Sequence, residues 1–228
     1  FLLSYLNKLY ETNMQLPLPT SEQALPGRDI PIQVSETHFV NGNLLKPAFN
    51  GELEIADFAL GCFWGAEKKF WEIENIYSTA VGYMGGFTPN ATYEEVCSGL
   101  TGHTETVRVF FNPSLVNYKI LLKTFWESHN PTQGMRQGND IGTQYSSAIF
   151  THSSEQKKLA DESLNIYDAQ LKEHGFSNIT TEISERGNFF YAEDYHQQYL
   201  AKNPSGYCGL GGIGAVSYTH LTLPTNGT

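Results

Sequence analysis

The segment GCFWG places Cys62 between two glycines and directly before two aromatic residues. The flanking patterns predict a strand over residues 54–60 and a helix over residues 66–74. A thiol at the amino end of a helix faces free backbone N–H groups, which lower its pKa and favour the thiolate. Although a free cysteine is more often a buried structural residue, this position predicts a nucleophile. We expect Phe63 or Trp64 to line a cleft beside it.

A carboxylate, Glu105, lies near the start of the predicted strand TETVRVFF. Strand alternation puts Glu105 on the same face as Val107 and Val109. A carboxyl group buried on an apolar face has a raised pKa and can donate a proton near neutral pH. The alternative, equally open from the sequence, is a residue at the strand end that reaches solvent. A thiolate and a neutral acid together would reduce or cleave a polar bond at an electrophilic atom.

The glycine-rich segment GYCGLGGIGAV over residues 206–216 carries a second thiol, Cys208. Its glycines fit a G-x-G-x-x-G pattern, but no predicted strand precedes them and no βαβ unit follows, so a dinucleotide site is not expected. Glycine supplies mobility, and a thiol on a mobile arm can condense with a sulfenic acid to form a disulfide. The third cysteine, Cys97, is expected to be a buried or half-buried structural residue.

The chain has 228 residues and a net charge of −10, from 24 acidic and 14 basic residues. Such an acidic protein is a poor candidate for binding nucleic acid or anionic membranes, and no apolar run approaches the ~18 residues of a membrane span. Three cysteines without a C-x-x-C pair indicate neither a disulfide framework nor a zinc site. We expect a cytoplasmic monomer with reduced thiols and no metal or nucleotide cofactor.

Strand and helix patterns interleave along one continuous unit. The expected strands cover residues 54–60, 76–83, 104–111, 144–150 and 179–184, and the expected helices cover 66–74, 93–97, 118–129, 153–175 and 191–202. Short, half-polar strands favour a two-layer α+β fold with helices packed on a mixed sheet. We expect an extended lead-in over residues 1–50, one domain over residues 51–216 that ends in glycine-rich coil, and a foreign or disordered tail over residues 217–228.

Several motifs, in the same order, resemble those of the A-type peptide methionine sulfoxide reductases, from about Ala24 to Gly214. They are GCFWGAE (61–67), GYMGG (82–86), TYEEVCSGLTGHTETV (92–107), QGNDIGTQYSSAIF (137–150), YAEDYHQQYL (191–200) and GYCG (206–209). The resemblance implies an α+β two-layer roll with a ferredoxin-like βαβ core. It also implies reduction of methionine-S-sulfoxide, free or in proteins, as a repair of oxidative damage.

The resemblance assigns a role to each matching residue. Cys62 attacks the sulfoxide sulfur and becomes a sulfenic acid, while Glu105 protonates the sulfoxide oxygen. Tyr93 and Tyr145 match the tyrosines that hydrogen-bond this oxygen. Asp140 matches a family acid that is associated with orienting a loop and with recycling by the reductant.

The remaining matches concern the substrate methyl group and the recycling of the enzyme. Phe63 and Trp64 match the residues that cradle the S-methyl group of the S epimer. Cys208 matches the first resolving cysteine, which forms a Cys62–Cys208 disulfide that thioredoxin reduces. Relatives often carry a second recycling cysteine eight residues beyond the first, where this chain has Val216. The resemblance therefore implies direct attack of thioredoxin on a two-cysteine system.

Two other hypotheses stay open. A thiol-based redox sensor or binding module would use Cys62 without turnover, and a cysteine hydrolase would need a base such as His103, His129 or His196. A proton donor at Glu105 favours the reductase, because sensing requires none.

Overall fold

The computed structural model describes residues 15–46 and 52–214. The strands are β1 (Glu54–Leu60), β2 (Ile76–Met84), β3 (Thr104–Phe111), β4 (Arg136–Gln137), β5 (Asp140–Ile141), β6 (Ser147–Thr151), β7 (Glu182–Glu185) and β8 (Phe190–Tyr191). The helices are α2 (Phe63–Trp71), α3 (Tyr93–Cys97), α4 (Tyr118–Ser128), α5 (Ser154–Glu173), α6 (Tyr199–Lys202) and the 3-10 helix η1 (Thr143–Tyr145). The chain is therefore α+β, as expected.

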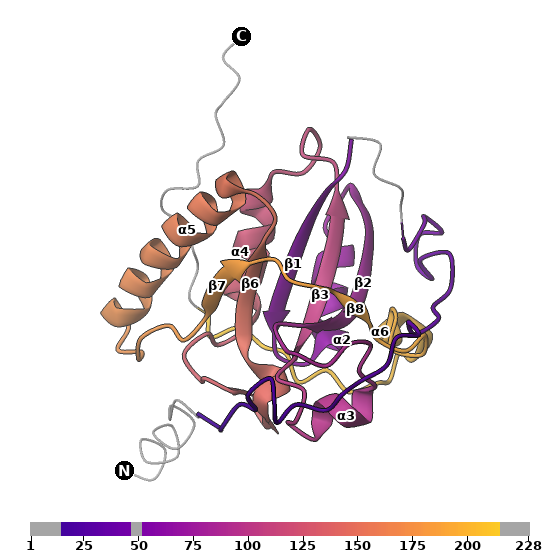
Figure 1. The fold of residues 1–228 in the computed structure, drawn as a ribbon. Coiled ribbons are helices and arrows are strands. Elements are labelled where there is room, and N and C mark those ends of the chain that lie inside the picture. The colour runs from indigo at the N-terminus through magenta and orange to yellow at the C-terminus, as the bar shows by residue number, and fades with distance from the viewer. Residues whose placement is uncertain (1–14, 47–51, 215–228) are drawn as a thin grey trace.

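Six strands form one mixed sheet in the order β7-β6-β1-β3-β2-β8. β1 and β2 each pair antiparallel with β3, which lies between them, so α2 connects two parallel strands in a split βαβ unit. β6 pairs antiparallel with the outer edge of β1, and β7 pairs parallel with β6. β1 and β3 lie side by side (Figure 1), and their antiparallel register, with Phe58 opposite Val107, brings the end of β1 next to the start of β3. Cys62 follows β1 and Glu105 is the second residue of β3, so the two lie close together.

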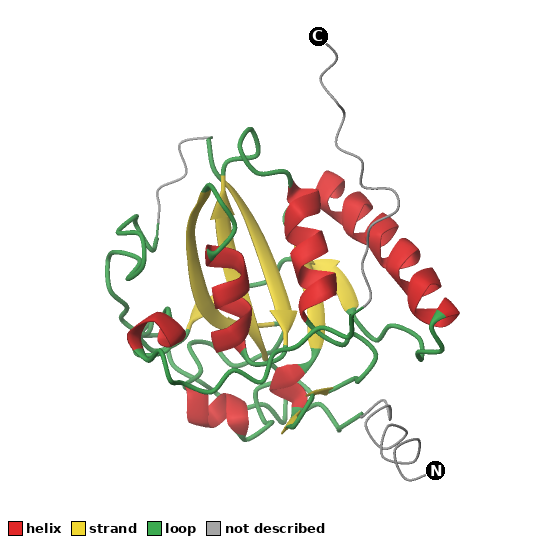
Figure 2. Cartoon of the chain, turned by 180° about the vertical axis from the view of Figure 1, so that it is seen from behind, coloured by secondary structure: helices red, strands yellow, loops and turns green. Residues whose placement is uncertain are grey.

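The helices cover one face of the sheet. Figure 2 shows α2 and α4 in front of the strands, with the long helix α5 beside them. Alternate side chains of β1 and β3, including Phe58 and Val107, are fully buried against these helices. The opposite face carries a smaller cluster around Met84 and Phe150, on which Phe189 packs. The two-layer arrangement follows from the period-2 alternation of each strand.

The expected elements differ from the observed ones mainly at their bounds. Helix α2 begins at Phe63 rather than at residue 66, because the turn at Gly61 already starts it. The strand expected over residues 144–150 begins at Ser147, since η1 precedes it. The strand expected over residues 179–184 is observed as β7, which begins only at Glu182.

The helix expected over residues 191–202 is wrong. Only α6 is helical there, Tyr191 belongs to β8, and turns connect the two elements. Gln198 has a left-handed backbone (φ 49°), which interrupts a helix. Its backbone N–H and side-chain amide donate to the buried Glu67 carboxylate, so long-range side-chain contacts replace local helix hydrogen bonds.

The described part of the lead-in, residues 15–46, contains turns and a single bridge between Thr37 and Leu44. Its Leu45 is fully buried, so this segment packs on the domain. Within the described ranges no helix is long and apolar enough to cross a membrane. The tail expected over residues 217–228 lies outside the described residues, as does Val216.

Candidate active site

Cys62 lies where β1 turns into α2, and its side chain is 8% exposed. Gly61 makes the turn with a φ of 97°, in the region that favours glycine. Burial raises the pKa of the thiol, and the Glu105 carboxylate adds to this rise. The N–H groups of Trp64 and Gly65 lower the pKa by less, so the net shift is upward. The expected lowered pKa is thus wrong for the reduced protein, because desolvation outweighs the helix dipole.

Glu105 is the carboxyl group that caps this helix from another strand. The backbone N–H of Phe63 donates to Glu105 Oε2 at 2.9 Å, and Cys62, the N-cap residue, makes no side-chain cap of its own. Glu105 is 1% exposed, and burial raises its pKa to about 8. The expectation of a buried acid with a raised pKa is confirmed, and the solvent-reaching alternative is wrong. At neutral pH Glu105 holds a proton next to the thiol.

The two expected tyrosines and Asp140 surround this pair. Burial raises the pKa of Tyr145, and the charges of Glu105 and Asp140 raise it further, which places all three within electrostatic reach of one another. Tyr93 begins α3, and its hydroxyl shares a hydrogen bond with the Cys97 thiol. The structure thus gathers the hydroxyl, carboxyl and thiol groups at one end of the sheet.

Cys97 does not have the expected burial. Its thiol is exposed and also shares a hydrogen bond with Gln144. Helix α3 is only five residues long and Cys97 is its last residue, so helical spacing alone could not predict whether this side chain is buried. All three cysteines are free thiols.

The glycine-rich arm lies over the first turn of α2. A Cβ atom added at Gly65 would stand 2.9 Å from Cys208 Sγ and 3.0 Å from Leu210 Cβ, so the absence of a side chain at Gly65 admits the arm. The Tyr207 hydroxyl donates to the Asp140 carboxylate at 3.4 Å. Cys208 Sγ therefore lies over Gly65, which is three residues beyond Cys62 in the first turn of α2.

The two aromatic residues after Cys62 have different environments. Phe63 is 1% exposed and belongs to the main core, where its ring contacts Tyr83. Trp64 is half-buried and stacks on Tyr199 at 3.9 Å between ring centroids. Trp64 is thus the one that borders the accessible side of the site.

Sequence reasoning gave Glu193 and Tyr207 no role in this site, and it considered His196 only as the base of a hydrolase. His196 packs on both aromatic residues, Glu193 accepts from the backbone of Tyr93, and Tyr207 binds Asp140. The first two lie in a segment predicted to be helical. All three lie within the motifs YAEDYHQQYL and GYCG, but their contacts are made to residues 67 to 132 positions away and could not be predicted from local patterns.

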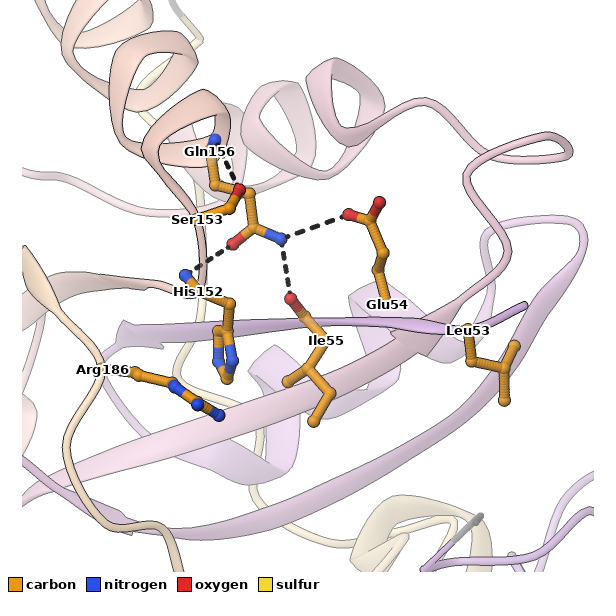
Figure 3. Close-up of a pocket in the computed structure, with 7 residues that line it drawn as sticks. All are labelled: Leu53, Glu54, Ile55, His152, Ser153, Gln156 and Arg186. Atoms are coloured by element: carbon orange, nitrogen blue, oxygen red, sulfur yellow. Dashed lines mark hydrogen bonds between the residues drawn. The ribbon is translucent and has the colours of Figure 1, made fainter. Parts of the chain in front are cut away.

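A separate cleft lies beside the amino end of α5 (Figure 3). Gln156 fills its polar side by donating to the Ile55 carbonyl at 2.8 Å and accepting from the His152 backbone at 3.0 Å. The cleft borders Glu54, the first residue of the seven-residue strand β1, whereas Cys62 follows the last. About 20 Å of strand separates the two ends, so this cleft is not part of the thiol site.

The fold and the site define a thiol-dependent oxidoreductase, in which a buried thiol, a neutral acid and a second thiol converge. A family model described as "Peptide methionine sulfoxide reductase" matches residues 54–215. The curated proteins "Peptide methionine sulfoxide reductase MsrA" of Rippkaea orientalis and of Pseudomonas syringae pv. tomato are 60% and 61% identical to the chain, over 90% and 86% of it and 94% and 92% of their own lengths.

Solved structures agree with the sequence relatives. Methionine sulfoxide reductase A of Corynebacterium diphtheriae superposes with a TM-score of 0.80 at 43% identity, covering 85% of this chain and 94% of that one. Reduced Mxr1 from Saccharomyces cerevisiae has a TM-score of 0.64 at 32% identity, covering 76% and 96%. The chain belongs to the peptide methionine sulfoxide reductase family and is an enzyme of that activity.

Proposed function

We propose that the chain reduces the S epimer of methionine sulfoxide, free or in proteins, with Cys62 as nucleophile and Glu105 as general acid. The observation that carries this assignment is the buried Glu105 carboxyl, held against the first turn of α2 by the Phe63 N–H and protonated at neutral pH. A sensor would not need such a donor, and none of the three candidate histidines hydrogen-bonds Cys62: each has its contacts elsewhere.

In the first step the Cys62 sulfur attacks the sulfoxide sulfur, and Glu105 gives its proton to the sulfoxide oxygen. The thiol proton returns to Glu105, the hydroxyl passes to Cys62, and methionine leaves. Cys62 is then a sulfenic acid, oxidised by the two electrons that the sulfoxide has gained. Tyr93 and Tyr145 are proposed to hydrogen-bond the sulfoxide oxygen, and Phe63 and Trp64 to cradle the S-methyl group.

In the second step the Cys208 thiol attacks the Cys62 sulfenic acid, which releases water and forms the Cys62–Cys208 disulfide. The position of Cys208 Sγ over Gly65 supports this step, because it places the thiol over the same turn of α2 that Cys62 begins. Thioredoxin is the proposed reductant, and its dithiol returns both cysteines to thiols. Asp140, which binds Tyr207 of the arm, is proposed to hold the loop during recycling. Three free thiols fit a reducing compartment such as the cytoplasm, and a monomer suffices for the site.

The test uses both epimers of a blocked methionine sulfoxide with thioredoxin, thioredoxin reductase and NADPH. We expect loss of the S epimer only, with no turnover in Cys62→Ser. Cys208→Ser should release about one methionine per enzyme and then stop. Peptide mapping of oxidised wild-type protein should join Cys62 to Cys208, and full turnover in Cys62→Ser would refute the assignment.

A further inference from the structure

His196 is the centre of an aromatic cluster next to the thiol, although the proposed chemistry does not use it. It is 1% exposed, and its ring centroid lies 5.1 Å from that of Phe63, 5.7 Å from Trp64 and 4.6 Å from Tyr93. These three residues are the proposed methyl cradle and one of the proposed oxygen donors. A single side chain thus touches several walls of the proposed binding site.

The hydrogen bond of the ring fixes its tautomer. The indole Nε1–H of Trp64 donates to His196 Nδ1 at 2.9 Å, and an indole nitrogen can only donate. Nδ1 is therefore the unprotonated nitrogen, and the ring proton is on Nε2. Burial lowers the pKa of His196 to about 4, so the imidazole stays neutral and keeps this acceptor at physiological pH.

The other side of the ring faces Glu193. Among the described residues Nε2 has no hydrogen-bond partner, and Glu193 Oε2 lies 3.9 Å from it. The same carboxylate accepts the backbone N–H of Tyr93 at 2.8 Å and the hydroxyl of Tyr83 at 3.1 Å. Glu193 therefore holds the first residue of α3, while His196, three positions later, holds the indole.

The segment that carries both residues is itself fixed to the core. Gln197 accepts from the Val81 N–H and donates to the Val81 carbonyl, both at 2.9 Å. Gln198 donates to Glu67 of α2 through its backbone and its side chain, each at 2.7 Å. The turns between β8 and α6 are thus clamped on the strand and the helix that flank the site.

We propose that His196 is a positioning residue that fixes the indole plane of Trp64 as a wall of the substrate pocket through the Nδ1 acceptor. It does not touch the reacting atoms, and it acts by keeping the indole in the orientation that receives the substrate methyl group. Without this acceptor the indole would be oriented only by its stacking on Tyr199 and its contacts with the core, which fix its plane less closely, at a cost to binding rather than to the chemical step. Its expected effect on the kinetics rests on the proposed function, whereas the orientation of the indole does not.

The test compares His196→Asn with His196→Gln. The amide of Asn branches at the carbon that carries Nδ1 and restores an acceptor there, whereas the amide of Gln lies one bond further, near Nε2. Both variants are neutral and polar, so they differ mainly in the position of the acceptor. The chain has three tryptophans, and Trp64→Phe assigns the Trp64 indole signal in a ¹H–¹⁵N spectrum.

We expect the Trp64 indole proton to keep its downfield shift in His196→Asn and to lose it in His196→Gln. In single-turnover assays the half-saturating sulfoxide concentration should rise about five- to tenfold in His196→Gln, the equivalent of one lost hydrogen bond, with a smaller change in the limiting rate. His196→Asn should stay within about twofold of wild type. Both changes follow from the acceptor alone.

Identical indole shifts in the two variants would overturn the positioning role. So would equal half-saturating concentrations together with a collapse of the limiting rate in both, because that pattern belongs to a residue in the chemical step. If the wild-type protein released no methionine, the proposed function would fail, while the indole spectra would still decide the position of the acceptor.

Discussion

At the scale of single residues, Glu105 shows how burial sets the protonation state of a group in the site. Its carboxyl group accepts the Phe63 N–H, which stabilises the charged form, but complete burial favours the neutral form more strongly and raises its pKa to about 8. Alternation in TETVRVFF was enough to predict this face. The helix-dipole argument for Cys62 failed, because the sequence does not reveal how deeply the fold buries the thiol, and burial is the largest cause of its raised pKa.

Replacing Glu105 by Gln should therefore slow the chemical step far more than binding. Gln keeps an oxygen for the Phe63 N–H but has no proton to give, so we expect the single-turnover rate at pH 7 to fall roughly 10²- to 10⁴-fold. In the wild type the rate should fall as pH rises through about 8, where Glu105 loses its proton, and the variant should lack this decline. Methionine release in rapid-quench experiments measures both.

The exposed Glu94 of α3 provides the matched control. Glu94→Gln removes one acidic charge from the same neighbourhood and should retain the wild-type rate and pH profile. A Glu105→Gln variant with a wild-type rate would contradict the general-acid role, as would an unchanged decline above pH 8.

At the scale of elements, local patterns predicted most strands and helices because each buries one face. They failed between Tyr191 and Lys202, where Gln197 and Gln198 bind Val81 and Glu67 rather than their own helix. Contacts over such separations leave no periodicity in the sequence. The arm, in contrast, was identified from glycine content alone, and its seat over Gly65 is information that only the fold supplies.

We expect Gly65→Ala to separate the two half-reactions. Ala favours the helix by about 1 kcal/mol, so α2 should not be weakened. Its methyl group would stand 2.9 Å from Cys208 Sγ and 3.0 Å from Leu210 Cβ, so these atoms of the arm must shift away from α2. The first methionine should be released at nearly the wild-type rate, whereas formation of the Cys62–Cys208 disulfide should slow by about tenfold or more. Mass spectrometry of samples quenched over time follows the sulfenic acid and the disulfide separately.

Gly211→Ala is the control on the same arm, since a Cβ atom there would meet nothing within 4 Å. It should form the disulfide at the wild-type rate. Equal rates in both variants would show that the position of Cys208 over Gly65 has no part in its delivery to Cys62.

At the scale of the whole molecule, buried acids of opposite behaviour lie on the two faces of the sheet. Asp57, on the face away from α2 and α4, is fully buried and contacts Arg108 at 2.8 Å and His152 at 2.7 Å, and these partners lower its pKa despite burial. Glu105 and Glu67, on the helix side, have pKa values raised to about 8 and about 7 by burial. The ion pairs of Asp57 therefore lose their contribution to stability in acid, and the two buried glutamates destabilise the fold in alkali, when they ionise.

The sign of each contribution sets the stability profile. A folded-state pKa above the ordinary 4.5 means that Glu105 and Glu67 contribute stability that is fully present below pH 4.5 and is lost as pH rises through about 7 to 8. The lowered pKa of Asp57 contributes stability present above its ordinary 3.8 and lost as pH falls below it. In mildly acid solution Asp57 is ionised and the two glutamates are still protonated, so both contributions to stability are present. We expect the free energy of unfolding to be greatest there.

We expect the free energy of unfolding to decrease from pH 5 to pH 9 in the wild type and to decrease less in Glu105→Gln, by on the order of 2 kcal/mol or more. Gln cannot ionise, so the variant escapes the desolvation cost that the wild type meets as Glu105 loses its proton. Urea denaturation of the reduced protein at each pH measures the difference, with Glu94→Gln as the surface control that should parallel the wild type. Parallel curves for Glu105→Gln and wild type would mean that Glu105 ionises at the same pH in the folded and unfolded chains, and the neutral acid at the centre of the proposed mechanism would be lost with it.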